Sequence, residues 1–263
     1  MNLNSSLDAG WHAKAPASRT HSKRFATKHA DEQTRASVWS ASGLPALSRI
    51  HGDARLFRLE MGSIGLILLL LNWPLLHGAC NSAMIFLPSP VRQGEWWRLL
   101  THPFVHVTWF HLLLDGAAFF LLYHDLAEHH WTKRFAWVFA SAAGSLLVSL
   151  WADPMISAKG LCGLSGIAHG LMGASALDLM AHARDKTVFR IGLGCFAVLF
   201  IKCLIEVLTG KMLFTFLYFG MVGDPVAVTH AGGLLGGIVA SLVFGPGAPA
   251  DAASYTHFQS QRD

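Results

Sequence analysis

Apolar residues gather in six long stretches that are separated by shorter polar segments. The stretches are Ser63–Cys80, His106–Tyr123, Phe135–Ala152, Ser165–Ala181, Phe189–Leu208 and Val226–Phe244. Each is close to the length of about 20 residues that a helix needs to cross a bilayer. Leu, Phe, Ala and Gly occupy most of their faces, whereas a helix of a soluble protein would show a polar face at helical period. The pattern predicts an all-α membrane protein with six transmembrane helices.

The composition agrees with this class of protein. Of 263 residues, 52% are hydrophobic and only 14% are charged, whereas a soluble domain carries about 25% charged residues. Much of the charge precedes the first apolar stretch. We therefore expect a polar, disordered cytoplasmic tail over residues 1–58, a six-span domain over 59–246 and a short tail over 247–263. The first tail has no apolar region of the kind found in a signal peptide.

Basic residues in the loops predict the orientation. They are frequent in the first tail, after the second span at Lys133 and Arg134, and after the fourth span at Arg184 and Lys186. Because Lys and Arg are enriched on the cytoplasmic side, both termini should be cytoplasmic. The sequence pI of about 9.0 then favours contact with anionic membrane lipids and not with nucleic acid.

The outward connection before the second span carries Trp97 and Arg98. Tryptophan beside arginine suits the headgroup region. The pair is therefore either an interfacial anchor or part of a brace around a site. Cys80 and Cys162 are also predicted near this side, where an oxidising compartment would allow them to form a disulfide.

Ionisable residues occur at the start of the second span. His111 and Asp115 are four residues apart and share a helix face, and His106 lies just before them. Such residues are costly inside a membrane and usually face a protein or water cavity. The alternative is a histidine that is satisfied by a neighbour near the interface.

The fourth span begins with Gly163-Leu164-Ser165-Gly166 and continues through His169 and Gly170. Alone, a serine at a helix start is an N-cap. A helix N-terminus, however, also offers free N–H groups to a developing oxyanion, and glycines let a substrate backbone approach closely.

The sixth span begins with His230, followed on the same helix face by Gly233 and Gly237. Small residues spaced by four let two membrane helices pack closely. Packing of the fourth span on the sixth would bring His230 to Ser165, whose hydroxyl needs a base to become a nucleophile. No acidic residue needs to complete a triad, and although Asp153 and Asp224 are available, nothing in the sequence ties them to His230. Lys202 and Glu206, four apart in the fifth span, are expected to pair with each other. A transport role is the alternative, which no other charges within the spans support.

These residues, in this order and in a frame of six spans, resemble the rhomboid intramembrane serine proteases. The resemblance runs from about Gly94 to Gly237 and rests on Trp97-Arg98, His106, His111, Gly163-x-Ser165-Gly166 and His230 with its glycines. It implies that Ser165 attacks a peptide carbonyl and that His230 is the base. It also implies an oxyanion hole formed by the Ser165 N–H and His111, and it requires no cofactor and no metal.

Asp115 departs from the family pattern, which has asparagine at this position. An ionised carboxylate only accepts hydrogen bonds and would repel an oxyanion. Asp115 therefore is protonated, orients His111 or lies outside the oxyanion hole, and we favour the orienting role.

The pattern GxSGxxHG, which includes His169, is similar to the rhombosortase subfamily. Members of this subfamily are thought to process the C-terminal sorting tails of exported bacterial proteins. The resemblance implies a transmembrane protein substrate and a bacterial inner-membrane location. His169 is a second candidate base, although we favour His230 because the base must lie beside the hydroxyl that it deprotonates.

Two alternatives come from other classes of protein. One is a catalytically inactive rhomboid-like protein that binds membrane clients. The other is a metal-binding membrane protein, since histidine and carboxylate side chains are common ligands. Its ligands would be His106, His111, Asp115, His169 and His230.

Overall fold

The computed structural model describes residues 54–126, 130–214, 219 and 226–245, and all of them belong to one compact unit, Gly52–Asp263. The expected tails at 1–58 and 247–263 fall outside these residues, except that the first helix already begins at Ala54.

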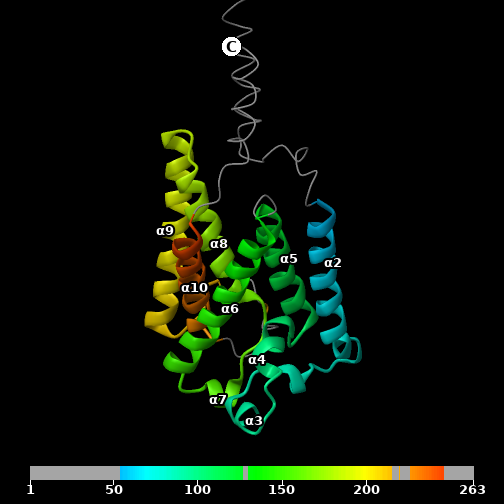
Figure 1. Ribbon diagram of the computed structural model, residues 1–263. Coiled ribbons are helices and arrows are strands. Elements are labelled where there is room, and N and C mark those ends of the chain that lie inside the picture. Colours follow the sequence, from blue (N-terminus) through cyan, green and yellow to red (C-terminus); the bar gives the residue numbers. More distant parts are fainter. Residues whose placement is uncertain (1–53, 127–129, 215–218, 220–225, 246–263) are drawn as a thin grey trace, which may run out of the picture. The chain divides into compact units, whose positions relative to one another are not determined.

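Within the described residues, all regular elements are helices (Figure 1). The long helices are α2 (Ala54–Leu71), α5 (Trp109–Asp125), α6 (Trp131–Ala152), α8 (Ser165–Ala181), α9 (Lys186–Thr209) and α10 (Val228–Phe244). The short ones are α3 (Pro88–Arg92), α4 (Arg98–Thr101), α7 (Ile156–Lys159) and the 3-10 turns η1 (Trp73–His77), η2 (Ser82–Met84) and η3 (His102–Phe104).

The first long helix is displaced from its predicted position. It covers Ala54–Leu71, whereas the apolar pattern predicted Ser63–Cys80, and this prediction was wrong. The helix stops at Asn72, whose side-chain amide donates to the carbonyl of Leu68. Pro74 follows in a 3-10 turn, where its missing N–H and fixed φ do not permit a continued α-helix.

Two of these helices, α6 and α9, are long and apolar enough to cross a membrane. A third crossing exists if Arg98–Phe104 and Trp109–Asp125, which meet at a bend of 92°, are counted as one broken span. Helices α8 and α10 have 17 residues each. These statements apply to the described residues, and the count of six spans stays a prediction.

Helix α10 lies against α6 and α8 (Figure 1). A Cβ atom on Gly233 would meet the carbonyl of Gly166, and one on Gly237 would meet the carbonyl of Gly170. On the other side of α10, a Cβ on Gly236 would meet the backbone of α6. The backbones of α8 and α10 are therefore in direct contact, which only small residues permit.

The loop before α5 is held by side chains that bond its own backbone. The buried Arg98 donates from Nη1 to the carbonyls of Ser82 and Ile85, at 2.7 and 2.6 Å. Trp97 donates from its indole N–H to the carbonyl of Ala83 at 3.1 Å. The two residues therefore act as structural supports of this loop.

The same loop is joined to the segment that precedes α8. Phe86 and Leu161 exchange two backbone hydrogen bonds of 3.0 Å in an isolated antiparallel bridge. Gly163 donates its N–H to the carbonyl of His102 at 3.1 Å. These contacts fix the position at which α8 begins.

Candidate functional site

The turn that leads into α8 brings the start of this helix close to α5. Gly163 has a φ of 97°, a value that side chains rarely permit. A Cβ atom there would lie 2.8 Å from both Asp115 Oδ2 and His111 Nε2. Glycine at this position therefore leaves room for these two side chains of α5, and Asp115 reaches Ser165, the first residue of α8.

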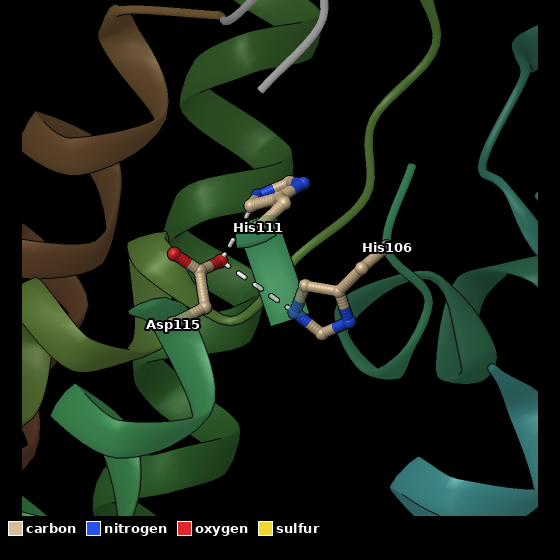
Figure 2. A group of neighbouring side chains, drawn as sticks. All are labelled: His106, His111 and Asp115. Atoms are coloured by element: carbon tan, nitrogen blue, oxygen red, sulfur yellow. Dashed lines mark ion pairs between the residues drawn. The ribbon is translucent and has the colours of Figure 1, made fainter. Parts of the chain in front are cut away.

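Asp115 lies at the centre of the first group of contacts. Its Oδ2 accepts a hydrogen bond from the N–H of Ser165 at 3.0 Å. The same oxygen lies 3.1 Å from His111 Nε2 and 3.6 Å from His106 Nε2 (Figure 2). Asp115 and both histidines are buried. The carboxylate thus occupies the serine N–H that the family resemblance assigns to the oxyanion.

Three side chains of this group have the composition of a metal site. One possible ligand atom each from His106, His111 and Asp115 lies within 4.8 Å of the others. Both ring nitrogens of His106 and Nδ1 of His111 have no hydrogen-bond partner among the described residues. His169 and His230, the other ligands considered for a metal, instead make their contacts with the side chains of α9.

His230 is the centre of the second group. Its Nδ1 lies 2.7 Å from Oε2 of Glu206, and the two side chains are 2% and 0% exposed. Because an ionised carboxylate only accepts, the proton of this contact belongs to Nδ1. Nε2 of His230 is then left as a hydrogen-bond acceptor, which is the state that a base requires.

Lys202 connects His230 with His169. Its Nζ lies 2.8 Å from both oxygens of Glu206 and 2.9 Å from Nε2 of His169. An ammonium group only donates, so Nε2 of His169 accepts and Nδ1 carries the proton. This Nδ1 donates to the carbonyl of Ser165 at 2.7 Å. Both ring nitrogens of His169 are thereby engaged.

The rings of His169 and His230 are stacked. Their centroids are 3.8 Å apart and their planes differ by 11°. Lys202 Nζ also lies 3.1 Å from Nδ1 of His230, but the shorter contact of Nδ1 with Glu206 places the proton on that nitrogen. His169 therefore forms a flat, fixed surface beside His230.

Ser165 links the two groups, since its N–H contacts Asp115 and its carbonyl contacts His169. The structure brings together in this region the residues singled out in the sequence, namely His106, His111, Asp115, Gly163, Ser165, Gly166, His169, Gly170, His230, Gly233 and Gly237. Glu206 was expected to pair with Lys202, and its contact with His230 was missed. The signal that could have pointed to this contact was an acidic residue within a membrane span.

Cys80 and Cys162, the pair considered for a disulfide, are free thiols in the structure. Burial raises the pKa of the Cys162 thiol to about 12, and the charges of Asp115 and Cys80 act in the same direction. A thiol with so high a pKa is a poor nucleophile, so burial disfavours Cys162 as a reactive group.

The helical fold, its apolar spans and the ionisable groups gathered among them define a membrane protein. The chain matches the Rhomboid domain over residues 93–247, which is more than half of its length. It therefore belongs to the rhomboid family, whose members are generally intramembrane serine proteases. No curated protein and no solved structure matches the chain significantly.

Proposed function

We propose that this protein is an intramembrane serine protease in which Ser165 is the nucleophile and His230 is the base. The observation that carries the proposal is that one side chain, His169, contacts both residues. It donates to the carbonyl of Ser165 and stacks on the ring of His230. The backbone contact between Gly166 and Gly233 also brings together the two helices that carry Ser165 and His230.

The reaction would follow the order of acyl transfer. The hydroxyl of Ser165 attacks the carbonyl carbon of a peptide bond while Nε2 of His230 takes its proton. The tetrahedral intermediate then expels the amine, which receives this proton from His230. Water, or an acceptor amine if the enzyme transfers the peptide, attacks the acyl-enzyme and releases Ser165.

His230 is favoured over His169 as the base by the hydrogen bonds of the two rings. His169 has both nitrogens engaged, with Lys202 and with the carbonyl of Ser165. Among the residues that the structure describes, His230 has only Nδ1 engaged, by Glu206 and Lys202. A free acceptor nitrogen is what proton removal from a hydroxyl requires.

The oxyanion would be held by the N–H of Ser165 and by Nε2 of His111. In the substrate-free protein, the Asp115 carboxylate occupies the place of that oxyanion. Its Oδ2 lies 3.0 Å from the backbone nitrogen of Ser165 and 3.1 Å from Nε2 of His111. We propose that the substrate carbonyl displaces it and that Asp115 then orients His111 from the side.

The substrate would be a transmembrane protein. The pattern GxSGxxHG around Ser165 and His169 supports a rhombosortase that processes C-terminal sorting tails in a bacterial inner membrane, with both termini of the enzyme in the cytoplasm. Co-expression with a candidate tail should give a cleaved product with the wild type and none with Ser165→Ala. Cleavage by Ser165→Ala would contradict the proposal.

A serine-directed fluorophosphonate tests the chemistry without knowledge of the substrate. The wild type should be labelled, Ser165→Ala should not, and His230→Ala should be labelled far more slowly than His169→Ala. Rapid labelling of His230→Ala together with no labelling of His169→Ala would make His169 the base. An inactive client-binding protein would not be labelled at all.

A further inference from the structure

Glu206, near the end of α9, makes a contact that a serine–histidine dyad does not need. We propose that Glu206 is a positioning residue that completes a Ser165–His230–Glu206 triad inside the membrane. This inference rests on the proposed protease function and adds to it a third residue, which contacts Nδ1 of His230, the nitrogen that does not act as the base in that proposal.

The first support is the geometry of the contact. Oε2 of Glu206 lies 2.7 Å from Nδ1 of His230, and the glutamate side chain is 0% exposed. A hydrogen bond of this length between an imidazole N–H and a carboxylate is charge-assisted and directional. It selects the tautomer in which Nε2 accepts, and it prevents rotation of the ring.

The second support is that the carboxylate is itself fixed. Lys202 donates to both oxygens of Glu206 at 2.8 Å. The backbone N–H of Leu213 donates to Oε1 at 2.9 Å. With these bonds and the one to His230, both oxygens have at least two neighbours, so the group that orients His230 is preorganised before substrate arrives.

The third support is electrostatic. Nζ of Lys202 lies only 3.1 Å from Nδ1 of His230. When His230 takes the serine proton it becomes a cation, and two cations at that distance repel each other strongly in a medium of low dielectric constant. Glu206 lies in contact with both groups, so its negative charge offsets this repulsion at the moment of proton transfer.

The competing interpretation is that Glu206 serves only to neutralise Lys202. Charged side chains inside a membrane usually occur in such pairs. This interpretation makes a different prediction for the variant that lacks both charges. If neutralisation were the whole role, Glu206→Gln combined with Lys202→Met would restore activity. If Glu206 positions His230, the double variant stays slow.

The experiment uses the full-length protein in detergent and measures the rate of inactivation by a fluorophosphonate. Glu206→Gln should lower kinact by about 100-fold or more, by analogy with triads whose acid is replaced by an amide. KI should change by less than about threefold, because the probe does not contact Glu206. The variant Glu206→Gln/Lys202→Met should be equally slow. Thermal unfolding would verify that each variant is folded.

Glu206→Asp provides a second measurement if the glutamine variant does not fold. It keeps the charge but shortens the side chain, so kinact should fall by about tenfold, between the wild type and Glu206→Gln. A wild-type rate in Glu206→Asp and in Glu206→Gln, or recovery of the wild-type rate in the double variant, would overturn the triad.

Glu60→Gln is the matched control, because Glu60 also pairs with a buried cation, Arg134, near the start of α2 and α6. Its kinact should equal that of the wild type. If the wild type itself is not labelled at Ser165, the protease proposal fails and the role of Glu206 with it. If Ser165 is labelled but Glu206→Gln reacts at the wild-type rate, only the triad is lost.

Discussion

The backbone N–H of Ser165, at the first residue of α8, donates a hydrogen bond of 3.0 Å to the carboxylate of Asp115 in α5. In the mechanism proposed above, this carboxylate closes the oxyanion hole to a substrate until it moves or is protonated. The contact also satisfies an N–H group that the helix itself leaves without a partner. The same bond would thus stabilise the resting enzyme and oppose catalysis.

Asp115→Asn should therefore react with a fluorophosphonate faster than the wild type. The amide has no net charge to repel the oxyanion, and its NH2 group can donate to it. We expect an increase of about two- to tenfold in kinact, the equivalent of one neutral hydrogen bond. A fall of about 100-fold or more would contradict both the blocking role of the carboxylate and the idea that a neutral amide can orient His111 as Asp115 does.

Gly233→Ala should separate the two helices that carry the site. Its methyl group would meet the carbonyl of Gly166, so α8 and α10 must move apart. We expect a loss of about 1–3 kcal/mol in the free energy of unfolding, the usual effect of an overpacked contact, together with loss of labelling at Ser165.

Gly194→Ala in α9 is the control for this variant, because a Cβ there would have no neighbour within 4 Å. It should keep the wild-type labelling rate and melt at the same temperature or slightly higher. Wild-type stability and labelling in Gly233→Ala would show that the backbones are not in contact in solution.

Glu60→Gln should destabilise the protein while it leaves the labelling rate unchanged. Glu60 accepts from the guanidinium of Arg134 at 2.7 and 2.8 Å and from the hydroxyl of Tyr123 at 2.9 Å. Loss of one partner of a buried pair costs about 3–5 kcal/mol. Since the Glu60 side chain is 26% exposed, we expect about 2 kcal/mol in thermal or denaturant unfolding. An unaltered stability would assign the pair to the exposed class, which contributes little.

Removal of metal ions should not change labelling. The serine mechanism needs only Ser165 and His230 with their partners, so treatment with a chelator should leave kinact at its original value. Loss of labelling with EDTA and its recovery on addition of Zn²⁺ would instead support a metal held by His106, His111 and Asp115. The variant His106→Ala should then show no such recovery.

The bounds of some helices could be predicted because they depend on the local pattern of apolar and polar residues. Helix α8 has the predicted bounds, Ser165–Ala181, since glycine and serine precede an apolar stretch there. The position of α2 was predicted wrongly because apolar residues continue beyond Leu71. The helix ends where the Asn72 amide bonds the preceding turn and the carbonyl of Phe104, and the latter contact lies 32 residues away.

In the candidate site, too, single residues could be predicted from the sequence, whereas one contact between distant helices could not. Ser165, His111 and His230 could be selected from the sequence, because polar residues at the ends of apolar stretches are few and each needs a reason. The bond between Glu206 and His230 spans 24 residues and two helices. Spacing within one helix paired Glu206 with Lys202, and this pair is present as well.

The sequence by itself determined the membrane class, the helical segments after residue 100 and the residue types able to do chemistry. These depend on local hydrophobicity and on the free-energy cost of placing each single polar residue in a membrane. The tertiary structure alone decided which nitrogens of His169 and His230 meet an acceptor or a donor, and hence where their protons lie, and which carboxylate faces which donor. Those choices depend on side chains that approach within hydrogen-bond distance only after α5, α8, α9 and α10 have packed together.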